Sequence, residues 1–377
     1  GAFSVISKTK AIDFGILRIV EIFKGKEILV LPILIFMFSL GGATFGMSEE
    51  SVAFIAILLP LVLALGYDSI VAMCVTYLAC NLGFSSAMLN PFTVGIGQSI
   101  AEVPLYSGVE YRTIIWFITT AVGCAFVMIY AMKIKKNPKL SPVFESDQIK
   151  HEKLKDIQSE SAEFTTSHKI IVLSLFIGIG IIVYGVLKLE FWIPEIAGIF
   201  LAVGLISGIV GKLEPNEMAS AFTEGAKDMI GAAILIGFAR SIMIIAQNAN
   251  IIDTILFNLS NAIGHLPSLI AAYIMLPIQM FINFFVNSGS GQAALTMPIL
   301  APLGDLVGIS RQLTVLIYQL GDGFSNAMFP TSGVLIACLG IAGIPYGKWL
   351  KWIIPLQIIL FICSLGFITV AKLIGWA

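Results

Sequence analysis

The block Gly83-Phe84-Ser85-Ser86-Ala87-Met88 returns later in the sequence as Gly323-Phe324-Ser325-Asn326-Ala327-Met328, with five of the six residues identical. The shift between the two copies is 240 residues (323 minus 83). The same shift pairs Ile12-Asp13 with Ile252-Asp253, and it pairs Phe45 and Ser48 with Phe285 and Ser288. Single matches between apolar helices often arise by chance, but five identities in six residues at a shared shift indicate an internal duplication.

The composition is that of a membrane protein. Of the 377 residues, 58% are hydrophobic and 12% are charged, and a soluble domain cannot cover that much apolar surface. The apolar residues form runs long enough to cross a bilayer, which takes about 20 helical residues. The net charge of −1 provides no basic field that would attract nucleic acid. We therefore expect an all-α, multi-pass membrane protein.

The apolar segments fall into two sets. The first set lies at about 28–47, 52–66, 69–90 and 112–133; the second lies at about 169–188, 193–211, 229–247, 267–286, 292–307, 312–330 and 348–375. This predicts a first membrane repeat over 1–133, a charged linker over 134–168 and a second membrane repeat over 169–377. The basic start of the linker places it in the cytoplasm by the positive-inside rule.

The two repeats are expected to begin differently. The second carries two or three apolar helices before the position that matches Gly1, so the first is expected to lack its N-terminal helices. Residues 3–27 mix apolar positions with lysine and arginine, which favours an amphipathic helix at the membrane interface.

Each repeat contains a Gly/Ser-rich interruption of an apolar run, at matching places. We call residues 41–51 the first hairpin break and residues 287–292 the second hairpin break. Irregular backbone at membrane depth is tolerated only where protein or water covers it, so each break predicts a re-entrant hairpin. The returning helix would present its N-terminus to a carboxylate or another oxygen ligand. The alternative is that the small residues only allow close helix packing. The expected site residues are Ser48, Glu49, Glu50 and Ser51 in the first break, and Asn287, Ser288, Gly289, Ser290 and Gly291 in the second.

A second pair of interruptions follows the repeated block. Leu89-Asn90-Pro91-Phe92-Thr93 forms the first proline break, and Phe329-Pro330-Thr331-Ser332 forms the second. Proline removes a backbone donor, so each helix is expected to unwind there and free carbonyl groups for Na+ or for a substrate donor. The alternative is a proline kink without function. The expected site residues around these breaks are Asn90, Thr93, Asn326, Thr331 and Ser332.

Five ionisable residues within or next to the apolar segments stand out: Glu49, Glu50, Arg240, Asp305 and Asp322. A charge inside the membrane is costly, so each is a functional candidate. Asp305, like Asp68, is expected at the interface near a helix end. Arg240 is expected either to pair with one of the acids or to meet a substrate carboxylate. The expected Na+ ligands are Ser48, Asn90, Ser288, Asp322 and Thr331.

Several of these stretches resemble a known family. The run Gly25-Lys26-Glu27-Ile28-Leu29, the run from Phe38 to Glu50 and Asn90-Pro91-Phe92-Thr93 are similar to the YfcC/DcuC-like C4-dicarboxylate anaerobic carrier family. Asn287-Ser288-Gly289-Ser290-Gly291-Gln292-Ala293 and Asp322-Gly323-Phe324-Ser325-Asn326 match the same pattern. The resemblance implies an ion-transporter-superfamily fold: two inverted repeats, paired re-entrant hairpins, and a scaffold plus a transport domain that moves as an elevator. It also implies a homodimer in the bacterial inner (cell) membrane.

The resemblance leaves two substrate classes open, because family members are described as C4-dicarboxylate carriers or as basic amino-acid exchangers. The first hairpin break carries Ser48-Glu49-Glu50-Ser51, where dicarboxylate carriers of the wider superfamily carry Ser-Asn-Thr. Two carboxylates would repel a dianion unless they were protonated or neutralised by Na+. This favours a substrate with an amino group.

The sequence therefore predicts a secondary active transporter of a small carboxylate-bearing solute, most simply an amino acid. Na+ or H+ would be the coupling ion unless the protein works as an exchanger, and no other cofactor is expected. The expected partners are the solute and the lipid bilayer. An ion channel and an intramembrane aspartyl protease are the alternatives, but the GxGD glycine of the protease is replaced here by Gln319.

Overall fold

The computed structural model describes residues 1–11, 14, 27–150, 165–189, 193–228 and 262–376, together with scattered positions between 230 and 258. The regular structure in this part of the chain is helical. The first set of elements comprises α1 (Ala2–Lys8), η1 (Glu27–Leu29), α3 (Val30–Phe45), α4 (Ser51–Ala64), α5 (Ser69–Met73), η2 (Cys74–Leu78), α6 (Ala79–Ser85), η3 (Pro91–Gly95), α7 (Ile96–Ile100), α8 (Val109–Lys136) and η4 (Pro138–Leu140). The second set comprises α10 (Thr166–Lys188), α11 (Ile193–Val210), α12 (Pro215–Asp228), α15 (Ser268–Phe285), α16 (Gly289–Leu306), α17 (Arg311–Asn326), α18 (Gly333–Ala342) and α19 (Tyr346–Leu373).

The helices of the two halves follow each other in the same order. Subtracting 240 from the bounds of each second-half helix from α15 to α19 gives, to within three residues, the bounds of a first-half helix. In this way α15 corresponds to α3, α16 to α4, α17 to the continuous α5–η2–α6 helix, α18 to η3 with α7, and α19 to α8. The shift found in the repeated block therefore also relates the lengths and the breaks of the helices. The pair Ile12-Asp13 and Ile252-Asp253 lies outside the described residues.

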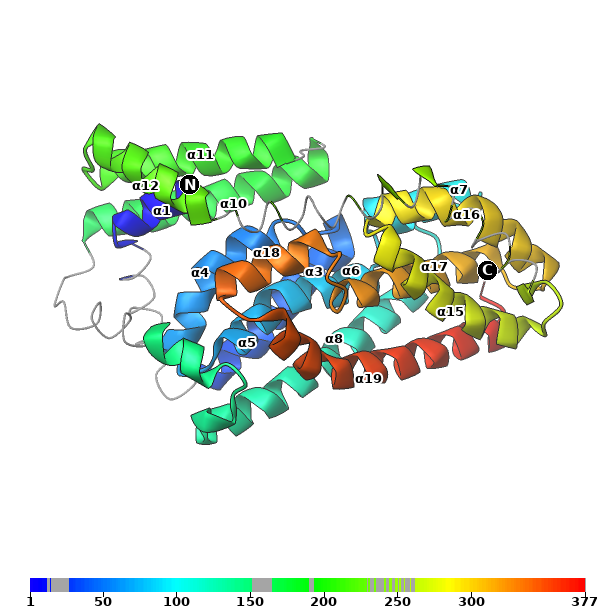
Figure 1. Cartoon of the computed structure of the whole chain (residues 1–377). Helices are drawn as coiled ribbons and strands as arrows, with labels where there is room; N and C mark the ends of the chain where they lie inside the picture. Colours follow the sequence, from blue (N-terminus) through cyan, green and yellow to red (C-terminus); the bar gives the residue numbers. More distant parts are fainter. Residues whose placement is uncertain are drawn as a thin grey trace.

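The short helix of each half packs against the other half. Helix α18 contacts α4 and α5, while α7 contacts α16 and α17. Figure 1 shows the resulting arrangement, with α18 beside α3 and α4 and with α7 beside α16. The long helices α8 and α19 contact each other and run along one edge of the molecule (Figure 1). The two halves are thus joined through exchanged helices around the contact between α6 and α17.

A separate group of helices is formed by α1, α10, α11 and α12 (Figure 1). Its small core contains Ile6, Ala11, Ile171, Leu175 and Val203. Helix α1 ends at Lys8, so it is much shorter than the amphipathic helix expected over 3–27; most of the remainder lies outside the described residues. Most of the apolar segment expected at 229–247, including Arg240, also lies outside them.

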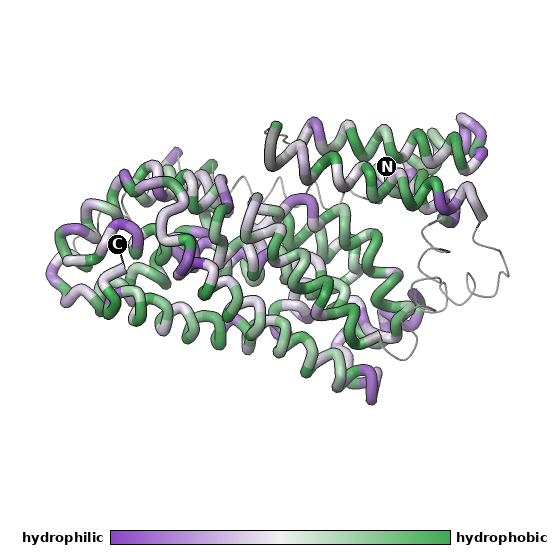
Figure 2. Tube along the Cα trace, turned by 180° about the vertical axis from the view of Figure 1, so that it is seen from behind, coloured by the Kyte–Doolittle hydropathy of each residue, from purple (hydrophilic) through white to green (hydrophobic). Residues whose placement is uncertain are grey.

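Three of the described helices are long and apolar enough to cross a membrane: Val109–Lys136, Ser268–Phe285 and Tyr346–Leu373. Several apolar helices are shorter, among them Ser51–Ala64 and Gly333–Ala342. Figure 2 shows hydrophobic residues along the long helices and hydrophilic residues gathered at several helix ends. Helices too short to span are what a protein with broken helices is expected to contain.

The start of the charged linker is packed against the helices. Ser141, Val143 and Asp147 are buried, although the sequence predicted a solvated segment over 134–168. The Asp147 carboxylate accepts from the backbone and hydroxyl of Ser69 at the start of α5, and the Ser141 hydroxyl donates to Asp68. Val143 belongs to the main hydrophobic core. Residues 151–164 lie outside the described part of the chain.

Candidate functional site

The first hairpin break is narrower than predicted. Helix α3 continues through Gly41 to Phe45 and ends at Gly46, whose φ of +77° lies in the left-handed region that favours glycine. The chain then turns over a few residues before α4 begins at Ser51. Within this turn the Ser51 hydroxyl donates to the Ser48 carbonyl (2.5 Å), and the Ser48 N–H donates to Glu50 Oε2 (3.1 Å). The polar groups of the turn are therefore partly used to hold its own shape.

The second hairpin break places a helix N-terminus at its tip, as predicted. Ser288 is the N-cap residue of α16, and its Oγ accepts from the N–H of Gly291 at 3.3 Å. Gly289, Ser290 and Gly291 form the first turn of that helix, so the irregular part covers only the residues before Gly289. Serine at this position satisfies one of the free N–H groups of the first helical turn.

At the first proline break one helix ends and another begins at the proline. Helix α6 ends at Ser85, and η3 begins at Pro91 with Asn90 as its N-cap, whose Oδ1 accepts from the N–H of Phe92 at 2.9 Å. Proline suits a first helical position because that residue needs no N–H donor. The carbonyls of Phe84 and Ala87, freed at the end of α6, both accept from the side chain of Gln319.

The carbonyls freed at the second proline break also have protein partners. Tyr77 Oη donates to the Asn326 carbonyl (2.9 Å), Trp349 Nε1 donates to the Ala327 carbonyl (2.8 Å) and Tyr346 Oη donates to the Met328 carbonyl (2.6 Å). The expectation that freed carbonyls bind the ion therefore loses support here. Side-chain oxygens remain as candidate ligands.

Asp322 is the acid that lies deepest in this region. Its side chain is fully buried, and neither carboxylate oxygen has a hydrogen-bond partner among the described residues. Gly289 of the second hairpin break packs beside it, because a methyl group added to Gly289 would lie 3.5 Å from Asp322 Oδ2 and 2.7 Å from Thr93 Cγ2. Thr93 Oγ1 is likewise buried and without a partner among the described residues. We call Asp322, Thr93 and Gly289 the Asp322 cluster.

The oxygen atoms of the Asp322 cluster suit a hard cation, a proton or an amino group. A carboxylate and a hydroxyl are oxygen ligands of the kind that hard cations prefer. Among the described residues no group of three or more His, Cys, Asp or Glu side chains is placed to hold a metal ion. A single carboxylate with neutral oxygens accords with a weakly held monovalent ion better than with a resident divalent metal.

Three asparagines meet next to this cluster. Asn283 Nδ2 and Asn287 Nδ2 each donate to Asn326 Oδ1 at 2.7 Å, and Asn283 Nδ2 also lies 2.9 Å from the carbonyl of Asp322. The sequence analysis named Asn287 and Asn326 but missed Asn283. A signal was present, because Asn283 is a polar residue in the last turn of an apolar helix, just before the second hairpin break.

The first proline break contacts both hairpins. A methyl group added to Gly46 would lie 2.6 Å from Asn90 Oδ1, while Thr93, three residues later, meets Gly289 of the second hairpin. The two predicted hairpins therefore flank a single helical turn, a separation suited to one small solute.

The other predicted residues are placed less centrally. Glu49 and Glu50 line a cavity of about 660 Å³ together with Gly340 and residues of α1, α11 and α12. Ser51 Oγ lies 3.7 Å from Cys338 Sγ of α18. Thr331 is buried with its hydroxyl unpaired among the described residues, and Ser332 is the N-cap of α18. Of the five expected Na+ ligands, only Asp322 belongs to the Asp322 cluster.

Two ionisable residues of the sequence analysis lie at helix ends. Asp305 forms an ion pair with Arg311 (2.8 Å) at the protein surface. Asp68 is buried as the N-cap of α5 and accepts hydrogen bonds from Tyr130 and Ser141. Asp68 therefore holds the linker and α8 rather than facing Asp322.

The sequence analysis missed a buried arginine. Its ionisable candidates included Arg240 but not Arg112, which is 1% exposed inside α8. The Nη1 of Arg112 donates to Gln319 Oε1 at 2.5 Å. The apolar segment was expected to begin at 112, so Arg112 stood at its very start and was not considered. Helix α8 starts three residues earlier, at Val109, and buries it.

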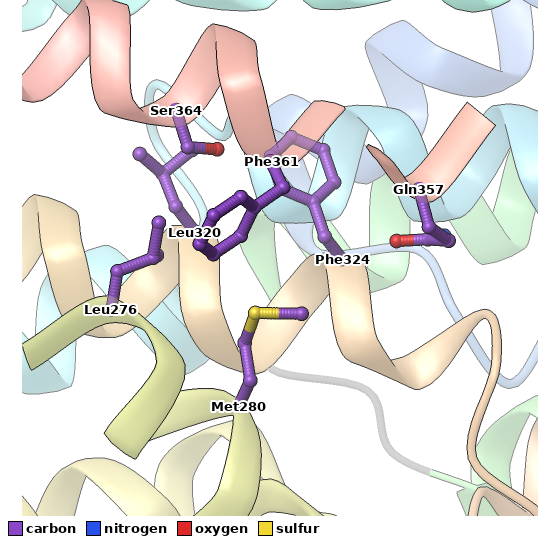
Figure 3. A pocket seen from close by; sticks show the side chains of 7 residues that line it. All are labelled: Leu276, Met280, Leu320, Phe324, Gln357, Phe361 and Ser364. Atoms are coloured by element: carbon purple, nitrogen blue, oxygen red, sulfur yellow. The ribbon is translucent and has the colours of Figure 1, made fainter. Parts of the chain in front are cut away.

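A second gap in the membrane part does not form a site. Leu276, Met280, Leu320, Phe324, Gln357, Phe361 and Ser364 surround a narrow space between α15, α17 and α19 (Figure 3). The space is too small for a water molecule, so the side chains can be regarded as packing contacts.

Comparison with known proteins gives the family. The chain matches the model of the DcuC family, described as C4-dicarboxylate anaerobic carrier, over residues 1–373. It is 46% identical over 387 residues to the "Putative basic amino acid antiporter YfcC" of Escherichia coli (strain K12), covering 100% of this chain and 76% of the relative. It is 32% identical over 358 residues to an "Uncharacterized protein" of Haemophilus influenzae, covering 94% of this chain and 70% of the relative.

A solved structure shares the fold. The chain resembles the YdaH transporter of Alcanivorax borkumensis with a TM-score of 0.52 and 17% sequence identity, covering 100% of this chain and 84% of that one. At this identity the likeness concerns the fold alone. The predicted family is confirmed, and so is the prediction of a transporter rather than an enzyme. This chain belongs to the C4-dicarboxylate anaerobic carrier family of membrane transporters.

Proposed function

We propose that this protein is a secondary active transporter of a small carboxylate-bearing amino acid, with a basic amino acid as the first candidate. Na+ or H+ is the coupling ion, unless the protein exchanges one solute for another. The observation that carries the proposal is the Asp322 carboxylate, which is buried in α17 without a hydrogen-bond partner among the described residues, where both halves of the chain meet.

A lone carboxylate in a membrane interior is costly when charged and unpaired. Binding of Na+, a proton or a cationic amino group at Asp322 removes that cost, so occupancy of the site depends on the ion or the substrate. Thr93 supplies a neutral oxygen, and Gly289 leaves space because any side chain there would collide with Thr93. Solute binding in this region would then be linked energetically to ion binding.

Two features favour an amino acid over a dicarboxylate. Glu49 and Glu50 place acidic groups on the first hairpin break, facing a cavity of about 660 Å³, and acidic groups attract an amino or guanidinium group while repelling a dianion. The 46% identical relative also carries the name of a basic amino acid antiporter. A C4-dicarboxylate remains the second candidate, because the family model is described as a C4-dicarboxylate carrier.

We further propose that the two helix sets are inverted repeats and that alternating access is an elevator movement. The repeated order of helices and the exchange of α7 and α18 between the halves support this reading. The long helices α8 and α19 would belong to the scaffold, and the hairpins with the Asp322 cluster would move against it. The basic end of α8 favours a cytoplasmic linker and hence a bacterial inner-membrane, multi-pass orientation. A homodimer is part of the same proposal.

Counterflow in proteoliposomes tests the function. Vesicles loaded with unlabelled L-arginine, L-ornithine or succinate are diluted into the labelled compound, with Na+ or a pH gradient present or absent. We expect saturable counterflow with one of the amino acids and little with succinate. Asp322→Asn should abolish ion-driven uptake, while Asp305→Asn, which alters a surface ion pair, should leave it unchanged. Wild-type protein that exchanges none of the three compounds would contradict the proposed substrate class, and flux that does not saturate would favour a channel.

A further inference from the structure

Arg112 of α8 has one hydrogen bond and no ion pair among the described residues. Its Nη1 donates to Gln319 Oε1, while Nε and Nη2 are buried and without partners there. The ion pairs Lys150–Asp147, Arg311–Glu102 and Arg311–Asp305 do not involve Arg112, and within the described part of the chain no acid neutralises it. The guanidinium carbon lies 5.3 Å from the ring centroid of Trp376, which covers one face.

The two unpaired nitrogens have a chemical meaning because they share one edge of the guanidinium. Nε–H and one N–H of Nη2 point in parallel and match the spacing of the two oxygens of a carboxylate. The third nitrogen, Nη1, is held in place by Gln319, and Trp376 restricts the plane. The residue thus presents an oriented edge for a planar anion, a task for which arginine is better suited than lysine.

The guanidinium of Arg112 is connected to the candidate site through Gln319. Gln319, which holds Arg112, also donates to the carbonyls of Phe84 and Ala87 just before the first proline break. Asp322 follows Gln319 by three residues on the same helix, about one turn away. The Arg112 guanidinium therefore meets α17 about one helical turn from Asp322. Its Nε and Nη2 edge and the Asp322 carboxylate are both unpaired among the described residues.

We propose that Arg112 binds the carboxylate of the transported solute and that Gln319 positions it. The assignment rests on the proposed function and names the group that recognises the carboxylate. A solute with an amino group and a carboxylate then finds an acidic partner in Asp322 and a basic partner in Arg112. A carboxylate on the Nε and Nη2 edge would also neutralise a buried charge that otherwise has no partner in the described chain.

Binding measurements with three probes test the assignment. L-Arginine and succinate carry carboxylates, whereas agmatine has the side chain and an amine of arginine without the carboxylate. Purified protein in nanodiscs is titrated with each probe by calorimetry. Wild-type protein should bind L-arginine at least about tenfold more tightly than agmatine, since a bidentate charge-assisted contact is lost with the carboxylate.

Four variants separate binding from structure. Arg112→Met and Arg112→Lys should weaken L-arginine binding by about tenfold or more. The affinity for agmatine should stay within about twofold of wild type, because agmatine has no carboxylate to form the bidentate contact. Gln319→Glu places a carboxylate against Nη1, so it should raise the melting temperature of the unliganded protein and weaken L-arginine binding. Arg311→Met, which removes an arginine from a surface ion pair, is the matched control and should bind all probes like wild type. Size-exclusion profiles and unliganded melting curves establish which variants fold.

The outcomes distinguish this assignment from the proposed function. If the single variants Arg112→Lys and Gln319→Glu each bind L-arginine as tightly as wild type does, Arg112 has only a structural role and the assignment is wrong. Equal weakening of agmatine and L-arginine would also contradict it. If wild type binds and transports neither L-arginine nor succinate, the proposed function fails and the assignment fails with it.

Discussion

Asn81 Nδ2 donates a 2.9 Å hydrogen bond to the carbonyl oxygen of Gly323. Asn81 stands two residues before the first copy of the repeated block, so this bond connects the helix of the first copy to the second copy. The contact is close, because a methyl group on Gly323 would run into the backbone of Ser85. Gly83 likewise packs against the backbone of Ser39. The glycines of the two copies are therefore retained for close helix contacts, in α3 with α6 and in α6 with α17, where a Cβ has no room.

Gly83→Ala and Gly323→Ala should each destabilise the protein strongly. The added methyl group meets backbone, which cannot rotate away as a flexible side chain can, so helices have to separate. We expect a loss of about 2–4 kcal/mol or failure to accumulate in the membrane. Thermal unfolding in detergent measures the loss. Gly340→Ala and Gly366→Ala have open space around the added methyl and should melt near wild type; equal melting of all four variants would show that the close contacts contribute nothing.

Gly289→Ala should reduce transport more than stability. Alanine is favoured over glycine in a helix, but here its methyl would lie 2.7 Å from Thr93 Cγ2 and would push Thr93 away from Asp322. Initial uptake rates in proteoliposomes should fall by about tenfold, in keeping with a displaced binding group.

The rescue variant for Gly289→Ala is Thr93→Ser, which removes the colliding methyl group and keeps the hydroxyl. Thr93→Ser alone should retain most uptake. The double variant Gly289→Ala with Thr93→Ser should recover at least part of the activity lost by Gly289→Ala. No recovery, with Thr93→Ser itself active, would mean that Gly289 matters for another reason, such as movement of the hairpin.

Much of the fold could be predicted from the sequence. Helices buried in the protein or the membrane need apolar runs, and the 240-residue shift relates the helices of the two halves. The helix N-terminus at Ser288 was also predictable, since serine followed by glycines after an apolar run is a local capping signal. Unwinding at the first proline break was expected, but the start of a new helix at Pro91 was not. The Asn90-Pro91 pair is itself a start signal, with an N-cap followed by a first-turn proline, and the structure uses it that way.

The remaining part of the candidate site depends on contacts between distant residues. Arg112 and Gln319 are 207 positions apart, and neither residue alone indicates the other. Arg112 stands at the start of the apolar segment expected over 112–133, and local hydrophobicity does not reveal that the packing of α8 against its neighbours buries it. The linker was misjudged for a similar reason: Asp147 looks solvated in a charged stretch, yet the backbone N–H of Ser69 at the start of α5 provides a buried partner for its carboxylate.

Gly46→Ala should destabilise the first hairpin break more than a left-handed glycine elsewhere. Alanine at a φ of +77° costs about 1–2 kcal/mol of backbone strain, and its methyl would also displace Asn90 Oδ1, which caps η3. Loss of the cap adds about 1 kcal/mol. Gly308→Ala is the matched control, because Gly308 has a φ of +72° and open space around it. Chemical unfolding should show the greater loss for Gly46→Ala, and equal losses would remove the contact with Asn90 from the explanation.

Lys150 joins the linker to a helix of the second half. Its Nζ lies 2.6 Å from Asp147 Oδ1, 2.7 Å from Ser69 Oγ and 2.7 Å from the carbonyl of Ala342, the last residue of α18. The Lys150 ammonium group also interacts favourably with the negative, C-terminal end of the α18 helix dipole. Through Lys150, the linker thus connects α5 of the first half to α18 of the second half.

Lys150→Met should weaken the connection between the linker and α18. Removing the ammonium leaves the Ala342 carbonyl and one Asp147 oxygen with fewer partners, so stability should fall by about 1–3 kcal/mol. Amide hydrogen exchange in peptides covering 141–150 should become faster, and so should exchange near the end of α18. Lys139→Met changes an exposed lysine of the same linker and should alter neither property. The double variant with Asp147→Asn completes a thermodynamic cycle, in which a coupling energy near zero would show that the two side chains do not act together.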